Sequence, residues 1–305
     1  MKLSKLFKAS SIKTLIATSL SAALMCSATA SAATSVWKVS KGNDYLYLGG
    51  TVHILPESAF PLPAEFEQAY KDTDTLVLEA KMPTTDDTSS QASMLQAMSY
   101  TDGKQLSDHL SPEVNQQLAE YFTQYGIQLS QLENFKPGFI MLQIMAIEMQ
   151  KAQITGIGVD SHFDKRAQQD NKAQLYLESL ESQIHLLANM GQGYEDSVIK
   201  LSLEQSGHYK KYIDDIIAAW RVGDIASLEN VLVAPIQDLD PQMYQDLLVK
   251  RNQAWLPKIE QMFGNEQREL VLVGAGHMAG QHSVIALLQA AGYQIEQVTA
   301  AGEQR

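Results

Sequence analysis

The chain has 305 residues and a formal net charge of −12 at neutral pH. Its first 32 residues hold four lysines and no acidic residue, so the remaining 273 carry 19 basic and 35 acidic side chains and a formal charge of −16. This balance argues against a nucleic-acid partner or an anionic membrane surface, because polyanion binding needs a basic face. With 45% hydrophobic and 19% charged residues, the composition is that of a globular protein with one large domain or two closely packed halves.

The amino terminus has the pattern of an export signal. Lysines precede an apolar run over residues 14–25, and residues 30–32 supply the small side chains of a cleavage site. We therefore predict a signal peptide over residues 1–32 and a periplasmic or secreted domain over residues 33–305, with retention as a signal anchor as the alternative. The one cysteine, Cys26, lies inside the predicted signal, so core burial alone would stabilise the mature protein. No later run reaches the roughly 18 apolar residues that span a bilayer, so we expect no stable membrane insertion after signal removal.

Short apolar runs near the start of the predicted domain indicate an α/β fold. Residues 36–48 hold two β-prone runs around a Gly-Asn turn, which predicts a hairpin. A helical stretch over residues 63–71 separates the second run from the apolar run over residues 75–79, and this order predicts a β-α-β unit. With the usual right-handed parallel crossover, His53 and Glu79 would lie at the carboxyl edge of adjacent strands.

The middle of the chain, about residues 83–262, is predicted to be a largely helical insertion. Its first part, residues 83–110, is rich in polar side chains and predicts a loop with one helical turn. The stretch from Phe139 to Met149 is apolar nearly all round, which favours a buried core helix over a peptide or partner groove. Residues 174–178 predict a strand that ends in a carboxylate, and the α/β pattern returns after residue 268.

Three ionisable side chains follow apolar strands and form the most distinctive pattern in the chain. Gly-x-x-His motifs end at His53 and His277, and Glu79 closes the run Leu-Val-Leu. Open α/β sheets place ligands at the carboxyl ends of their strands. Two imidazoles and a carboxylate suit a divalent transition metal with open positions for water and substrate.

A structural interpretation of the same residues is also open. A histidine at a strand end is more often a hydrogen-bonded structural residue than a metal ligand, so the spacing by itself does not decide. Glu79 is harder to explain in this way, because a carboxylate at the end of an apolar strand is costly to bury unless it is paired or ligated.

Four further residues are candidates for a supporting role. Each of them could orient a metal ligand or clamp a substrate carboxylate, and each could equally be a structural ion-pair or hydrogen-bond partner. They are Asp160, Glu178, Arg251 and Asn252.

Other familiar chemistries are argued against by the sequence. It has no His-Glu-x-x-His, no phosphate-binding loop, no Gly-x-Ser-x-Gly elbow and no cysteine after residue 32. The motif Gly-Ala-Gly-His-Met-Ala after the strand at residues 269–273 imitates a dinucleotide fingerprint. However, the 31 residues that follow Gly274 leave room for one helix and one strand, without an acidic residue placed to bind a ribose.

Taken together, these motifs resemble the TraB/GumN family, the bacterial relatives of the Tiki metalloproteases, and also the wider erythromycin-esterase-like group. The resemblance extends over nearly the whole predicted domain and implies a mixed β-sheet flanked by helices. The matching segments are residues 47–53, 76–79, 158–163, 250–259 and 273–277.

The resemblance also implies where the active centre lies. The family's proposed centre, two Gly-x-x-His motifs and a glutamate after the second core strand, falls on His53, His277 and Glu79. The Tiki branch implies dependence on a divalent metal of the cobalt or manganese kind. Tiki and pheromone-shutdown relatives carry a membrane segment near the carboxyl terminus that is not found in this sequence, so we do not carry over their membrane-proximal substrates.

These observations favour a metal-dependent hydrolase of peptide bonds in which His53, Glu79 and His277 hold manganese, cobalt or zinc or share its water. Two alternatives stay open. A non-catalytic protein that sequesters a peptide or signal is favoured by the methionine-rich stretch from Phe139 to Met149. A metal-free esterase with a histidine as general base is allowed by the erythromycin-esterase resemblance. The expected partner is a peptide or small-molecule substrate, and the oligomeric state is left unassigned.

Overall fold

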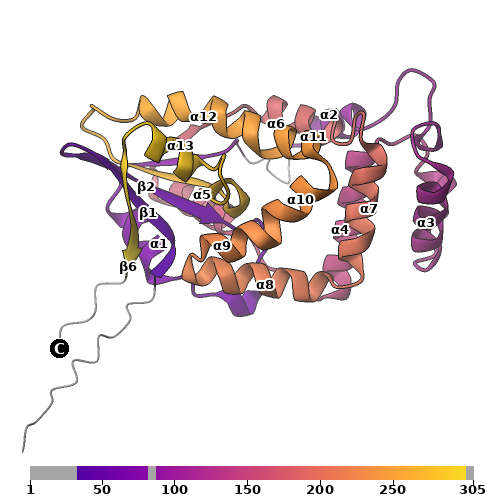
Figure 1. Ribbon diagram of the computed structural model, residues 1–305, viewed down its shortest axis with the longest axis horizontal. Coiled ribbons are helices and arrows are strands. Elements are labelled where there is room, and N and C mark those ends of the chain that lie inside the picture. The colour runs from indigo at the N-terminus through magenta and orange to yellow at the C-terminus, as the bar shows by residue number, and fades with distance from the viewer. Residues whose placement is uncertain (1–32, 82–86, 300–305) are drawn as a thin grey trace, which may run out of the picture. The chain divides into compact units, whose positions relative to one another are not determined.

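Six strands among the described residues form one mixed sheet (Figure 1). The strands are β1 (Ala33–Lys41), β2 (Asp44–Thr51), β3 (Thr75–Leu78), β4 (Ala173–Tyr176), β5 (Glu269–Gly274) and β6 (Gln294–Thr299). The computed structural model describes residues 33–81 and 87–299, so the predicted signal peptide, residues 1–32, lies outside the described residues. In the order β4-β3-β5-β2-β1-β6, β1 is antiparallel to both of its neighbours and the other pairs are parallel. The predicted mixed α/β sheet is confirmed.

The predicted hairpin joins β1 to β2. Lys41 pairs with Asp44, which leaves Gly42 and Asn43 as a two-residue turn. Gly42 has a φ of 64°, a conformation that glycine adopts without the steric cost that a side chain brings. The hairpin fixes the register of β2, whose last residue, Thr51, precedes His53 by two positions.

β5 lies between β2 and β3, so the prediction that the strands before His53 and Glu79 are adjacent is wrong. All six residues of β5 are buried, and its leucines and valines contact the cores on both faces of the sheet, which suits a central position. Gly274 pairs with Thr51, and Leu272 pairs with Leu78. The residues after all three strands therefore share one carboxyl edge, as the sequence predicts.

One face of the sheet is covered by a core of aromatic rings. The ring centroid of Phe66 lies 6.3 Å from that of Phe163 and 5.4 Å from that of Trp220. Each of these side chains is fully buried, and such burial stabilises a fold by ~1.5–3 kcal/mol per large apolar side chain. Trp220 Nε1 donates to Gly50 O at 2.6 Å, which ties a helix to β2 close to His53. The helices of this face are α1 (Ala64–Lys71), α5 (Val159–Asp170) and α8 (Tyr209–Val222).

A second core covers the opposite face. Val77 and Val271 project to this side, whereas their neighbours in β3 and β5 project to the first. Trp255 and Ile259 of α12 (Lys250–Glu260) and residues of α13 (Val284–Ala290) pack against them. The central strands β3 and β5 are thus buried on both faces, as their continuous apolar runs predict, whereas none of the residues of the edge strand β4 is buried.

The insertion predicted over residues 83–262 is largely helical and contains β4. Several of its helices pack on one another in a separate hydrophobic cluster rather than on the sheet. None of the helices within residues 33–81 and 87–299 combines the length and apolar character that crossing a membrane requires. The remaining elements are η1 (Glu57–Ala59), α2 (Thr88–Ala97), η2 (Leu106–Asp108), α3 (Pro112–Thr123), η3 (Leu129–Gln131), α4 (Pro137–Lys151), α6 (Leu180–Ala188), α7 (Glu195–Ser206), α9 (Ile225–Leu228), η4 (Glu229–Val233), α10 (Ala234–Leu239), α11 (Pro241–Tyr244), η5 (Gln245–Val249) and η6 (Ala275–Met278).

Two parts of this insertion differ from prediction. Residues 83–110, predicted as a loop with one turn, contain the ten-residue helix α2, capped by Asp87; none of its residues is buried, so no apolar periodicity marks it. The helix predicted to be buried at Phe139 to Met149 is buried only in part. Within α4, Ile140 and Ile144 are core residues, but Met141 and Met145 are partly exposed and line a cavity.

Candidate functional site

His53 is held by the amino end of α5. The ring Nδ1 lies 2.8 Å from Asp160 Oδ2, in the first turn of that helix. The backbone N–H of Val159 donates to Val52 O at 3.1 Å, so the loop that carries His53 is tied to α5 through main chain and side chain. The His53 side chain is 59% exposed.

Glycines allow this loop to approach α5 closely. A Cβ at Gly158 would lie 2.2 Å from the carbonyl oxygen of His53, and a Cβ at Gly156 would lie 2.0 Å from that of Leu55. Real Cβ atoms essentially never approach other atoms so closely. The Gly-Ile-Gly turn is therefore required by the contact that positions His53 and Asp160.

Glu79 directly follows β3 and is fully paired. Its Oε1 accepts from the backbone N–H of Gly274 at 2.7 Å. Its Oε2 accepts from Arg251 Nη2 at 2.6 Å and from Gln183 Nε2 at 3.2 Å. These donors account for a carboxylate that is only 11% exposed at the end of an apolar strand.

His277 lies in η6, directly after β5, and is buried. Its Nδ1 donates to Asn252 Oδ1 at 2.5 Å, since the amide oxygen can only accept. Asn252 is itself oriented by donation from Nδ2 to His282 O at 2.8 Å. The Nε2 atom of His277 therefore carries a lone pair, and it accepts from Arg251 Nη1 at 3.0 Å.

Arg251 links the carboxylates of Glu79 and Glu178 to His277. Its Nη2 binds both Glu79 and Glu178, its Nε donates to Glu178 Oε1 at 3.1 Å, and its guanidinium lies 4.7 Å from the ring centroid of Trp255. All three guanidinium nitrogens donate within the protein. Arg251 is thus an ion-pair partner here and has no nitrogen left free to clamp a substrate carboxylate. Glu178, at the end of β4, serves as its second anion.

His53, Glu79 and His277 meet beside Gly274. A Cβ at Gly274 would lie 3.3 Å from His53 Nε2, 3.4 Å from Glu79 Oε1 and 3.6 Å from His277 Cδ2. Glu79 Oε1 and His277 Nε2 are 3.9 Å apart. The structure therefore brings together the three side chains that the sequence singles out, and glycine at position 274 keeps the space between them open.

Asp160 determines the charge of His53. Loss of hydration and the positive charge of Arg251 lower the pKa of His53. The hydrogen bond to Asp160 and the negative charges of Asp160 and Glu79 outweigh them and raise this pKa to about 9. Because more than half of the side chain is exposed, the contact with Asp160 outweighs the lost hydration. His53 is therefore protonated at neutral pH.

The pKa values of Glu79 and His277 are both lowered, but by different causes. Burial by itself would raise the pKa of Glu79, but protonated His277, Arg251, protonated His53 and the N–H of Gly274 lower it to about 2. Burial lowers the pKa of His277 to about 3, with Arg251 and His53 acting in the same sense and Glu79 opposing them. His277 is neutral near pH 7, so Arg251 and His53 are the cations that keep Glu79 ionised there.

The donor atoms at this site suit a divalent transition metal, but one contact stands in the way. Both imidazoles have Nδ1 bound to an acceptor, the arrangement that directs Nε2 of metal-binding histidines toward the ion. However, Arg251 donates to His277 Nε2, the atom that a metal would need. Among the described residues, no three His, Cys, Asp or Glu side chains already lie close enough to hold an ion. Metal binding would require the guanidinium to release His277 while it keeps Glu178.

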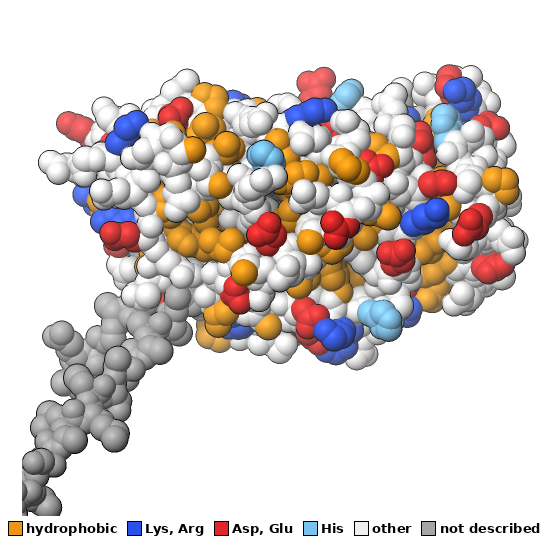
Figure 2. All heavy atoms as spheres, viewed as in Figure 1, with side chains coloured by type: hydrophobic (Ala, Val, Ile, Leu, Met, Phe, Trp, Pro, Cys, Tyr) orange, Lys and Arg blue, Asp and Glu red, His pale blue; other side chains and the backbone are white. Residues whose placement is uncertain are grey.

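An apolar hollow of about 420 Å³ opens from these residues. His53, Arg251, Gly274 and His277 are among the residues that line it. Figure 2 shows hydrophobic side chains interspersed with acidic ones on the face where α9 and α10 lie. The apolar part of the wall includes Met141, Met145, Ile213, Ile216, Leu232 and Leu247.

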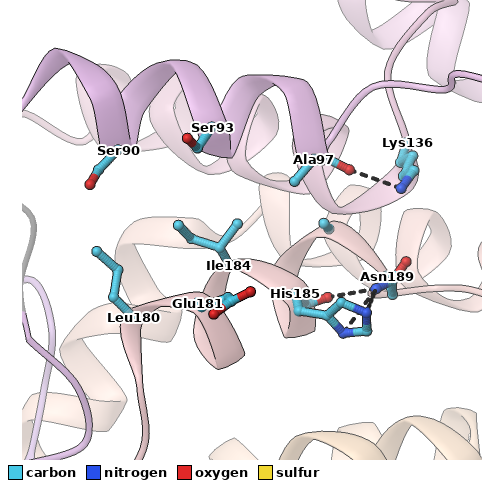
Figure 3. Close-up of a pocket in the computed structure, with 10 residues that line it drawn as sticks. Ser90, Ser93, Ala97, Lys136, Leu180, Glu181, Ile184, His185 and Asn189 are labelled. Atoms are coloured by element: carbon cyan, nitrogen blue, oxygen red, sulfur yellow. Dashed lines mark hydrogen bonds between the residues drawn. The ribbon is translucent and has the colours of Figure 1, made fainter.

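A larger hollow, of about 710 Å³, lies between α2 and α6 and has a different character. Figure 3 shows Ser90 and Ser93 of α2 opposite Leu180 and Ile184 of α6. No convergent set of reactive groups is found among the described residues that line it. Gln183, also on α6, contacts Glu79 and Glu178, so this helix separates the larger hollow from the sheet edge. We therefore assign the candidate site to the sheet edge.

Two contributors to the site are not predicted from the sequence. Gln183 donates to Glu79 and Glu178, but a glutamine in the first turns of an amphipathic helix gives no signal of such a role. Trp255 contacts both Arg251 and His277, with 4.4 Å between the ring centroids of Trp255 and His277 and 42° between the ring planes. Its position four residues after Arg251 on one helix is the signal that could have indicated this contact.

The family is decided by a match that spans the fold. The profile of the TraB/PrgY/gumN family matches residues 35–297, which include every strand but the ends of β1 and β6. The chain belongs to the TraB/PrgY/gumN family. The resemblance inferred from the motifs is thus confirmed.

Curated relatives are distant. The chain is 25% identical over 260 residues to the protein described as "Uncharacterized protein YbaP" of Escherichia coli (strain K12), covering 81% of this chain and 89% of that protein, and equally to its counterpart in Shigella flexneri. It is 23% identical over 194 residues to a "Metalloprotease TIKI homolog" of Nematostella vectensis, covering 53% of this chain and 40% of that protein. No solved structure matches the chain.

Replacing Gly158 by alanine should destabilise the protein by about 1–3 kcal/mol, because the new methyl group overlaps the carbonyl of His53 and the loop must move. Urea unfolding followed by circular dichroism measures the change. Gly207→Ala is the matched control, since no atom lies within 4 Å of its Cβ position and its backbone is helical. Equal stability of the two variants would show that α5 does not hold the His53 loop as described.

The His53 ring should titrate with a pKa of about 9, and Asp160→Asn should lower this pKa toward the ordinary value of 6.5. Because the pKa is raised on folding, the protonated ring stabilises the fold fully below about 6.5, and this stabilisation is lost as the pH rises through about 9. NMR of the imidazole Cε1–H measures the pKa, and urea unfolding at pH 6 and pH 10 measures the linked stability. A stability difference between wild type and Asp160→Asn that grows with pH would contradict the assignment.

Proposed function

We propose that this protein hydrolyses amide bonds of the peptide kind at the site formed by His53, Glu79 and His277, with manganese, cobalt or zinc as a cofactor. The observation that carries the proposal is the meeting of the three side chains beside Gly274, with Nδ1 of each imidazole held by an acceptor. Membership of the TraB/PrgY/gumN family and the distant similarity to a metalloprotease TIKI homolog support a hydrolase. The signal peptide predicted over residues 1–32 supports action in the periplasm or outside the cell.

The cofactor would be held by Nε2 of His53 and of His277 together with Glu79. When bound, a divalent metal supplies a Lewis acid that polarises a carbonyl and lowers the pKa of water. Asp160 and Asn252 keep the two rings oriented for this task.

Glu79 has two chemically distinct oxygens. Oε2 is occupied by Arg251 and Gln183, whereas Oε1 accepts one backbone N–H and faces both imidazoles. Oε1 is therefore the atom that would hold the cation or accept the proton of the attacking water. The low pKa of Glu79 favours the first role, because a strongly ionised carboxylate is a good ligand and a weak base.

A metal-free hydrolase is the second candidate, and one contact favours it. Arg251 already donates to His277 Nε2, so the guanidinium occupies the position that a cation would take. In this alternative His53 is the histidine that does not contact Arg251, and in its protonated form it would act on an ester as a general acid. The metal experiment below separates the two candidates.

Metal should stabilise the protein if the first candidate is right. Manganese, cobalt or zinc at about a hundred times the dissociation constant adds roughly 2.7 kcal/mol to the stability of a folded protein. Differential scanning fluorimetry with each metal measures this shift, and His53→Gln and His277→Gln should each abolish it. Full hydrolytic activity after exhaustive chelation, with no bound metal by elemental analysis, would favour the metal-free candidate instead.

Glu79→Gln should reduce the hydrolysis rate by roughly 10²–10⁴-fold, because the amide can neither bind a cation strongly nor accept a proton. The fold should persist, since Arg251 keeps its ion pair with Glu178. Release of fluorescent amine from peptide amides measures the rate. The exposed Glu181→Gln on α6 is the matched control and should keep wild-type activity. Undiminished activity of Glu79→Gln would remove Glu79 from the reaction, and no activity in the wild type with any metal would favour a non-catalytic binding protein.

A further inference from the structure

The apolar hollow and the candidate site are one continuous space. His53, Arg251 and His277 line the hollow together with side chains from α4, α8 and the two π-helical turns η4 and η5. Its volume of about 420 Å³ is within the range of small-molecule sites. A group that fills the hollow would therefore have one end at the reacting residues.

Several side-chain polar atoms that line the hollow have partners within the protein, whereas the buried Thr51 Oγ1 has none. Ser202 Oγ donates to Val198 O at 2.8 Å, and the hydroxyl of Tyr212 is hydrogen-bonded to Gln205. Among the described residues that line the hollow, the ionisable acids and bases other than tyrosine are His53, Arg251 and His277. Apart from these three residues, the lining thus offers contact without charged groups and with few free hydrogen-bonding groups.

The two π-helical turns contribute to the apolar wall. Leu232 lies in η4, and Leu247 and Leu248 lie in η5. A π-helical turn inserts an extra residue into a helix and is frequently found at functional sites. In this chain both turns present leucine to the same hollow, and Arg251 follows η5 by two residues.

From this geometry we propose that the hollow holds the unbranched alkyl chain of a fatty acyl group whose carbonyl lies at His53, Glu79 and His277. An extended peptide would bury several amide N–H and C=O groups where few partners are free, which is costly. An alkyl chain has no such groups, and each methylene gains from leaving water.

The cleavage step of this proposal rests on the proposed function. The substrate would be a fatty-acyl amide: water adds to the acyl carbonyl carbon, the C–N bond breaks, and the fatty acid leaves as a carboxylate. One proton of the water goes to the amine nitrogen and the other to solvent. Binding of the chain does not depend on this step and can be measured without turnover.

The test uses methyl ketones of 4 to 12 carbons, which carry the carbonyl and the chain but no leaving group. Their affinity for the full predicted mature chain, measured by tryptophan fluorescence or calorimetry, should rise about threefold to fourfold for each added methylene until the hollow is filled. An affinity that does not depend on chain length would overturn the proposal.

A variant that fills the hollow supplies the second arm. Met145→Trp, on the wall, should weaken binding of the longest ketone by at least about tenfold, whereas Ala146→Trp, exposed on the same helix, should leave it unchanged. Circular dichroism confirms that both variants are folded. Equal binding by the two folded variants would place the chain elsewhere and overturn the assignment.

Acyl aminocoumarins of the same chain lengths separate this proposal from the hydrolase. Release of aminocoumarin that increases with chain length would support both. Chain-dependent ketone binding without release would retain the acyl hollow and overturn the hydrolase. Release that is equal for acetyl and dodecanoyl amides, with no chain dependence in binding, would retain the hydrolase and overturn the acyl hollow.

Discussion

The buried ion pairs of Arg251 hold the carboxyl edge of the sheet together. Glu79 and Glu178 end neighbouring strands, and the N–H of Glu178 donates to the carbonyl of Glu79 at 2.7 Å, so two carboxylates lie side by side with little water. Two neighbouring carboxylates repel each other, and an ion pair with a shared cation offsets this repulsion. Arg251 supplies that cation and also contacts His277 Nε2, so one guanidinium joins three of the ionisable side chains at this edge.

Much of the architecture follows from local pattern. The hairpin at Gly42, the burial of β5 on both faces and the Ser-Pro start of α3 are each encoded within a few residues. The place of β5 in the sheet is not encoded locally, because strand order depends on which pairing buries most surface over the whole chain. The helix α2 also escapes prediction, since it buries none of its residues and so carries no apolar stripe.

The sequence indicates which residues form the candidate site but not which contacts they make with one another. Ionisable residues at the ends of apolar strands indicate His53, Glu79 and His277, because burial of such groups needs a reason. The sequence cannot tell that Arg251 reaches all of Glu79, Glu178 and His277, since these contacts join residues that are 26 to 172 positions apart. It likewise leaves open whether apolar residues such as Met145 face a core or a cavity, because both environments select the same side chains.

Because β5 is a central strand but lies late in the sequence, the sheet can be completed only late in synthesis. β2 and β3 are synthesised early, yet neither pairs with the other, and the strand that joins them ends only at Gly274 of 305 residues. Until those residues leave the ribosome, both early strands keep an open edge and the two cores cannot close. A chain of this topology therefore completes its central sheet only after most of its residues have been synthesised.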